Sequence, residues 1–207
     1  MLVIGINGSP AKNGNTAYLL DTARETVEGL GACFELVHAA DALRGLRQPF
    51  CTACSTPCTG VCYQNKRLAP VLARLRQADA VLLGSPVYFG TVSAQMKAFW
   101  DHTRLLRAQK ALLNVVGGAI AVGGARFGGQ ETTLRALQDI MLVHGMMVVG
   151  DGYWTEDCGH QGAAAQRPSQ QDENGIVRVR ILAQRVVEVA EATRGLREKV
   201  RSRETTL

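Results

Sequence analysis

The chain has 207 residues, of which 46% are hydrophobic and 20% are charged, and its formal net charge at pH 7 is +5. This length fits one α/β domain with an elaborated loop, and no apolar run reaches the roughly 20 residues of a membrane-spanning helix. No basic segment precedes the first apolar run, and the positive excess near the C-terminus is interleaved with acidic residues and lacks aromatic ones. We therefore expect one cytoplasmic domain, residues 1–207, that binds neither membranes nor nucleic acid.

Short apolar runs alternate with segments of helical periodicity along the whole chain. The expected strands are residues 2–6, 34–37, 78–84, 115–122 and 146–149. The expected helices cover residues 19–30, 67–77, 93–107, 131–144 and about 176–200. Because the strands are continuously apolar, they indicate a parallel sheet covered on both faces, as in a doubly wound three-layer α/β/α sandwich. Two segments, residues 39–66 and 151–174, are expected to be irregular.

The turn after the first strand, residues 5–16, is rich in glycine and short polar side chains. A strand-to-helix turn directs backbone N–H groups and a helix N-terminus at one point, which suits a phosphate. Ser9, Asn15 and Thr16 add side chains that can donate hydrogen bonds. Asn15 stands where a P-loop has its lysine, and the G-x-G-x-x-G pattern is absent. The segment predicts a site for a single terminal phosphate, with an ordinary capped turn as the alternative.

Two further loops follow the third and fourth expected strands, at residues 85–93 and 123–131. The first combines aromatic side chains with Gly90, and the second is so rich in glycine that its amides can approach a ligand closely. Ligands of open parallel sheets bind at the carboxyl ends of the strands, where these loops lie. Each loop alone is compatible with ordinary turn chemistry, but together the three favour FMN, a planar ring with one phosphate. Arg126 is placed where a cation would stabilise reduced flavin or attract a nicotinamide phosphate.

Four of the six cysteines, Cys51, Cys54, Cys58 and Cys62, fall within residues 48–66, which we call the cysteine loop. Such a compact group of thiols is typical of an iron–sulfur cluster, here a [4Fe–4S] cluster. Structural zinc, which more often uses two separated pairs, and a thiol-rich loop without metal remain alternatives. Disulfides are not expected in a reducing compartment.

These motifs resemble the NADPH-dependent FMN reductase family, and within it the iron–sulfur flavoprotein branch. The resemblance is carried by Gly-Ser-Pro at 8–10, Gly-Asn-Thr at 14–16, residues 85–90, Gln-Met-Lys-Ala-Phe at 95–99, and the glycines of 123–131. It implies a flavodoxin-like fold, with a five-stranded parallel sheet of order 2-1-3-4-5 and the cysteine loop as an insertion. It also implies non-covalent FMN and a homodimer or homotetramer. The expected cofactor-binding residues are Ser9, Pro10, Asn15, Thr16, Pro86, Val87, Tyr88, Phe89, Gly90, Gly123, Gly124, Arg126 and Gly128.

The chain departs from the branch at two positions. The usual cysteine spacing is C-x2-C-x2-C before a longer gap, whereas here Pro57 occupies the third position and Cys58 follows it. The segment that usually ends in Asp-Arg ends here in Asp101-His102. The first departure concerns the third cluster ligand, because Cys58 lies one position later than in the usual pattern. For the second departure, the sequence alone indicates no consequence.

The expected function is electron transfer between NADPH, NADH or ferredoxin and a small acceptor such as a quinone, oxygen or free flavin. We name no catalytic side chain, because a flavin carries this chemistry while the protein binds and orients it. Two alternatives remain: an NAD(P)H-dependent flavin or quinone reductase without a cluster, and a non-enzymatic electron carrier of the flavodoxin type.

Overall fold

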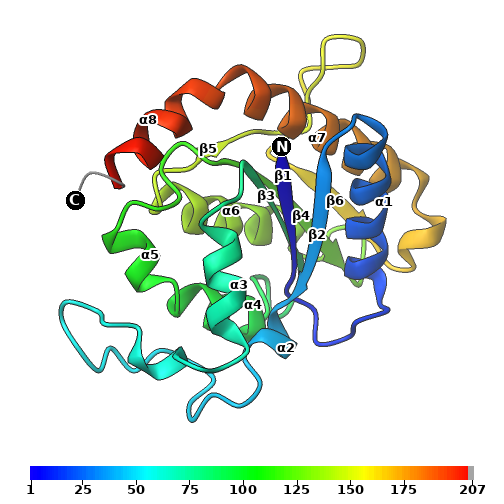
Figure 1. The fold of residues 1–207 in the computed structure, drawn as a ribbon. Coiled ribbons are helices and arrows are strands. Elements are labelled where there is room, and N and C mark those ends of the chain that lie inside the picture. Colours follow the sequence, from blue (N-terminus) through cyan, green and yellow to red (C-terminus); the bar gives the residue numbers. More distant parts are fainter. Residues whose placement is uncertain (205–207) are drawn as a thin grey trace.

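A parallel sheet forms the centre of the molecule (Figure 1). This is a computed structural model that describes residues 1–204, with side chains to residue 202. The sheet runs in the order β2-β1-β3-β4-β5, with β6 also pairing β4, which confirms the expected flavodoxin-like order. Its strands are β1 (Leu2–Asn7), β2 (Cys33–His38), β3 (Ala80–Pro86), β4 (Val116–Gly123), β5 (Met147–Val148) and β6 (Ala163–Gln166).

Helices cover both faces of the sheet and enclose two apolar cores. Helices α1 (Asn15–Gly29) and α7 (Glu173–Ala192) pack on one face, where Val3 of β1 points toward them. The other face, with Ile4 and Ile6, is covered by α3 (Leu68–Leu75), α4 (Ala94–Asp101) and α6 (Gln130–Leu142). The shorter elements are α2 (Ala39–Ala42), η1 (Val61–Tyr63), α5 (Arg104–Ala108), η2 (Ser169–Gln171) and the terminal α8 (Arg194–Glu204). Within residues 1–204, no helix is both long and apolar enough to cross a bilayer.

The outer edge of the sheet differs from expectation, because two short strands share it. β5 pairs with Val116 and Gly117 of β4, and β6 pairs with residues 120–123 further along the same strand. The expectation that residues 151–174 are irregular was therefore wrong at β6. Its Ala-Ala-Ala-Gln sequence carries no β-branched or aromatic residue, so only pairing with β4 and packing under α7 define it as a strand. Residues 149–162 leave the sheet between the two strands.

Two other boundaries were also wrong. The helix expected at residues 93–107 is divided into α4 and α5, because the N–H groups of His102 and Thr103 bond to carbonyls three residues back and tighten the turn. Residues 39–66, expected to be irregular, contain α2 and η1.

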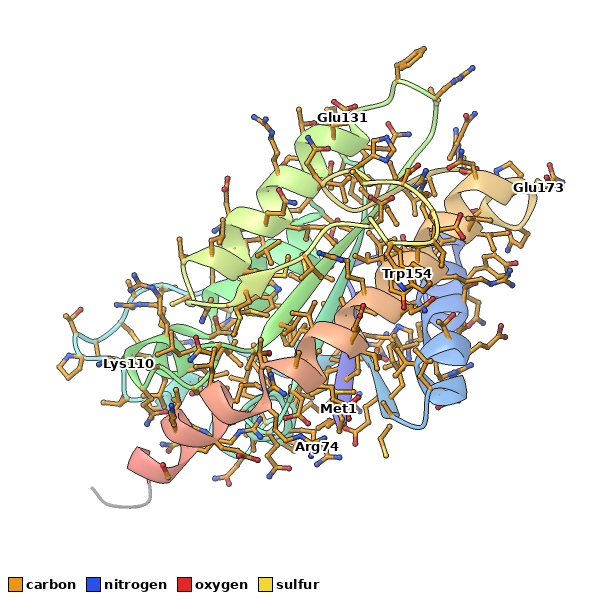
Figure 2. The ribbon with its side chains drawn as sticks, turned by 90° about the horizontal axis from the view of Figure 1, so that it is seen from above. Met1, Arg74, Lys110, Glu131, Trp154 and Glu173 are labelled. Atoms are coloured by element: carbon orange, nitrogen blue, oxygen red, sulfur yellow. The ribbon has the colours of Figure 1, made fainter. Side chains whose placement is uncertain are left out.

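The carboxyl ends of the strands and the starts of the following helices gather at one end of the molecule. Figure 2 shows Glu131 and Glu173, near the starts of α6 and α7, at that end, while Arg74 and Lys110 lie toward the opposite one. The three loops that the sequence singled out therefore meet at the same edge.

Candidate functional site

The first turn, residues 7–16, is held in shape by its own side chains. Asn7 Oδ1 accepts a hydrogen bond from Ser9 N at 2.8 Å, and Asn7 Nδ2 donates to Ala11 O at 3.4 Å. Ser9 Oγ accepts from Ala11 N at 3.1 Å. Asn7, which the sequence did not single out, therefore organises the turn.

This turn leaves a group of donors without protein acceptors. Among residues 1–204, the hydroxyl groups of Ser9 and Thr16 and the amide nitrogen of Asn15 donate no hydrogen bond. Helix α1 starts at Asn15 with Gly14 as its N-cap and no side-chain cap, so its first backbone N–H groups are also available. Hydroxyl, amide and helix N-terminal donors in one place suit a phosphate.

The second turn, residues 85–93, presents an open surface. Tyr88 and Thr91 exchange two backbone hydrogen bonds of 2.9 and 3.2 Å. Phe89 and Gly90 between them have φ values of +51° and +76°, as in a type I′ turn. A Cβ atom added at Gly90 would meet nothing within 4 Å, so a flat group can approach the backbone there. Phe89 at the tip is fully exposed.

Hydrogen bonds join the three loops into one structure. Ser93 Oγ donates to Gly8 O at 2.6 Å and accepts from Met96 N at 3.1 Å, so it links the first two loops and caps α4. Thr132 Oγ1 donates to Gly90 O at 2.6 Å, which links the second and third loops. We call residues 7–16, 85–93 and 123–132 together the cofactor rim.

The third loop is organised by the buried side chain of Gln130. Its Oε1 accepts from Gly128 N at 2.8 Å, and its Nε2 donates to Ala125 O at 2.7 Å. Arg126 instead lies over the exposed ring of Phe127, with the guanidinium carbon 5.6 Å from the ring centroid. Both residues line a cavity of about 610 Å³ that extends toward β6 and α7 and does not include the first turn. Arg126 therefore lines a cavity that is separate from the first turn.

The rim fits FMN in its donor chemistry. The free donors of the first turn suit a phosphate, and the open backbone at Gly90 suits a planar ring. The expected residues of the three loops thus share one edge of the molecule. Ser93 and Gln130 were not among the expected site residues; for Ser93, its position just before a helical segment was an available signal of an N-cap.

The cysteine loop lies between α2 and α3 and is less closely packed. Cys54 and Cys62 are exposed, and Cys51 and Cys58 are partly exposed. Within the described part of the chain, no three Cys, His, Asp or Glu side chains lie close enough to hold one metal ion. The pKa of Cys62 is raised, first by burial and then by the charges of Cys54, Cys51 and Cys58. A cavity of about 420 Å³ is lined by Cys51, Cys54 and Cys62. Thiolates are the ligands that an iron–sulfur cluster uses, so these side chains have the chemistry to hold one.

His102 connects this loop to α4. Its Nδ1 lies 3.8 Å from Cys62 Sγ, and its Nε2 lies 3.3 Å from Pro49 O. One ring thus contacts both the beginning and the end of the cysteine loop, and burial lowers the pKa of His102 below its usual value. The second departure from the family pattern is therefore a residue that anchors the cysteine loop.

Residues 1–161 match the model of the NADPH-dependent FMN reductase family. The chain belongs to this family. It is accordingly a flavin-dependent NAD(P)H oxidoreductase with FMN as its cofactor, as the sequence analysis expected.

Individual relatives support the same assignment. The chain is 40% identical over 191 residues to iron-sulfur flavoprotein MJ1083 of Methanocaldococcus jannaschii, covering 91% of this chain and 97% of the relative. It is 42% identical over 94 residues to an NAD(P)H dehydrogenase (quinone) of Chromohalobacter salexigens, covering 44% of this chain and 47% of that protein. The crystal structure of a flavodoxin, WrbA-like protein from Agrobacterium tumefaciens has a TM-score of 0.66 at 21% identity, covering 92% of this chain and 98% of that one, which shows a shared fold.

Proposed function

We propose that the chain binds FMN on the cofactor rim and a [4Fe–4S] cluster through Cys51, Cys54, Cys58 and Cys62. The two groups together pass electrons between NADPH, NADH or ferredoxin and a small acceptor such as a quinone, oxygen or free flavin. FMN supplies hydride and single-electron exchange, while the side chains bind and orient it. The active form is a cytoplasmic homodimer or homotetramer.

FMN binding is supported by two features that lie on the same hydrogen-bonded rim: the free donors of the first turn and the open backbone of the second. In the first turn, the hydroxyl groups of Ser9 and Thr16 and the amides at the start of α1 bind the phosphate. In the second, the backbone at Gly90 accepts the ring, flanked by Tyr88. The amides of the third loop then face the polar edge of that ring. Because the loops are already joined through Ser93 and Thr132, little rearrangement is needed on binding.

The cluster is supported by the thiols and by similarity. Three of the four cysteines, Cys51, Cys54 and Cys62, line one cavity, and His102 contacts Cys62 and Pro49 of the loop. The relative named an iron-sulfur flavoprotein matches this chain over nearly its whole length. The partial relative named an NAD(P)H dehydrogenase (quinone) supports a quinone as one acceptor.

One alternative has its own support. A flavin or quinone reductase without a cluster agrees with the finding that, in residues 1–204, no three potential ligands lie within reach of one metal ion. In that case the cysteine loop has a structural role only.

Purification without oxygen separates these two functions. The proposal expects about four iron and four sulfide per chain and visible absorbance beyond that of flavin. Steady-state NADPH oxidation with a quinone acceptor then tests the reaction itself. A protein that contains FMN, oxidises NADPH and holds no iron supports the cluster-free alternative. A chain that binds no FMN in calorimetry contradicts both.

A further inference from the structure

A segment far along the chain reaches the first turn. Ser169, at the start of η2, donates its backbone N–H to Asn15 Oδ1 at 2.8 Å. Ser169 is fully buried, and its hydroxyl oxygen has no hydrogen-bond partner among the described residues. Because this hydroxyl and the amide share one Cα atom, the unpartnered hydroxyl lies beside the N-terminus of α1. A buried hydroxyl without a partner is unfavourable, and a bound acceptor would satisfy it.

Arg167 connects the same segment to the third loop. Its backbone N–H donates to Gly123 O at 3.0 Å. Its guanidinium group lies along Gly124, where an added Cβ atom would come within 3.4 Å of Arg167 Nε. In the described residues this guanidinium has no hydrogen bond or ion pair. Residues 167–169 therefore run beside the rim, from the end of β4 to the start of α1.

The charges near the rim indicate what residues 167–169 do. A phosphate monoester carries between one and two negative charges near neutral pH. Lys12, the cation within the first turn, forms an ion pair with Asp41, and Arg126 lies over Phe127. Arg167 is a cation beside the rim that no protein group neutralises in the described part of the chain.

We infer that Arg167 and Ser169 complete the phosphate site of the flavin cofactor. The hydroxyl of Ser169 donates to a phosphate oxygen, and the guanidinium of Arg167 supplies the counter-charge that the first turn lacks. This inference rests on the proposed binding of FMN to the rim. It adds that Arg167 and Ser169, which lie more than 150 positions from the first turn, make the chain bind FMN more tightly than riboflavin.

The test compares FMN with riboflavin, which has the same ring and no phosphate. Affinities of the full-length chain, stripped of flavin, are measured by calorimetry or flavin fluorescence. We expect Arg167→Met to weaken FMN binding about tenfold or more and to leave riboflavin binding unchanged. Ser169→Ala should act in the same direction with a smaller effect, and Arg167→Lys should restore part of the loss. Arg180→Met, which removes an exposed arginine of α7, is the matched control and should change neither affinity.

A second readout is ionic strength. FMN affinity of the unaltered chain should fall more steeply with added salt than that of Arg167→Met, because one charge pair has been removed. Circular dichroism and a thermal melt verify that each variant is folded.

Three outcomes would overturn the inference. If Arg167→Met weakens FMN and riboflavin equally, Arg167 acts on the ring and not on the phosphate. If it changes neither, the residue is outside the site. In both cases normal FMN binding by the unaltered chain leaves the proposed function intact. If the unaltered chain binds neither flavin, the proposed function fails together with the inference.

Discussion

The cofactor rim and the cysteine loop prepare their ligand groups in opposite ways. On the rim, Ser93 and Thr132 link the three loops and Gln130 fixes the third, through hydrogen bonds of 2.6 to 3.1 Å. In the cysteine loop the thiols are exposed or partly exposed, and few side-chain contacts fix them apart from that of His102.

This difference agrees with the ligand that we propose for each site. A neutral or anionic cofactor held by weak bonds benefits from donors that are already placed, because ordering them on binding would reduce affinity. Thiolates that lie close together repel one another. A loop that holds them close is therefore unfavourable unless a cation is bound. The rim is ordered by hydrogen bonds within the fold, whereas the cysteine loop, on our proposal, is ordered by the cluster that it binds.

The largest effect is expected from removing one thiol. Cys54→Ala should abolish the cluster, because it removes one of the four thiolates proposed to hold it, and should leave FMN binding unchanged, because the rim is independent of the loop. Iron, sulfide and flavin contents measured on protein prepared without oxygen give the result. Cys158→Ala, an exposed cysteine outside the loop, is the matched control and should retain full iron. Loss of flavin along with iron in Cys54→Ala would show that the two sites depend on each other.

A pH effect tests the packing beneath the cysteine loop. His144 is buried, its Nε2 lies 2.9 Å from Thr103 Oγ1, and burial followed by the charge of Arg107 lowers its pKa to about 4. The unfolded chain, with a histidine pKa of about 6.5, binds this proton first, so stability is fully present above pH 6.5 and is lost as the pH falls toward 4. From pH 7.5 to 4.5 the free energy of unfolding should drop by about 2 kcal/mol on this account. Urea denaturation should show a smaller drop for His144→Gln, and an equal drop would contradict the assignment.

A substitution within the rim tests its close packing. A Cβ atom at Gly123 would collide with the side chain of Gln130. Gly123→Ala should therefore destabilise the fold by about 1–3 kcal/mol and weaken FMN binding, because Gln130 positions the third loop. Gly29→Ala, where the added atom meets nothing within 4 Å, is the control and should be neutral or slightly stabilising. Chemical denaturation measures both, and equal stability of the two variants would mean that the third loop adapts.

The smallest effect is expected from the link between the first two loops. Ser93→Ala removes the cap of α4 and the bond to Gly8 O, at a cost of about 1–2 kcal/mol. FMN affinity should decrease modestly as the first turn loosens. Thr132→Ala breaks the other link, at an exposed position, and should cost less. If Ser93→Ala leaves stability unchanged, the rim is held by its backbone alone.

The central strands and the rim were predictable because their signals are local. β1, β3 and β4 begin and end within two residues of the expected positions, since each is a continuous apolar run followed by a glycine- or proline-containing turn. The free donors of Ser9, Asn15 and Thr16 were predictable for the same reason, because the residues that form a turn are adjacent in the sequence.

Long-range contacts were not predictable in this way. β6 exists through its pairing with β4, and Ser169 reaches Asn15 because α7 packs against α1. Neither residue type nor spacing near position 169 carries that information. For Arg126, whose place in a glycine loop predicts a position near the flavin edge, the structure shows that its guanidinium lies over the neighbouring ring of Phe127, and its role toward the flavin stays a prediction.

The outer edge of the sheet, which β5 and β6 share, also offers a site for protein engineering. Residues 149–162 depart from β5 and return as β6 against the same neighbour, and Trp154 stands exposed on this excursion (Figure 2). The base of this segment is fixed, because Asp151 N donates to His160 O and Arg178 pairs with Asp157, so only its tip, residues 154–156, can change in length without shifting either strand. The tip is therefore a suitable site for inserting a reporter peptide or a tether, because the cofactor rim is left unchanged.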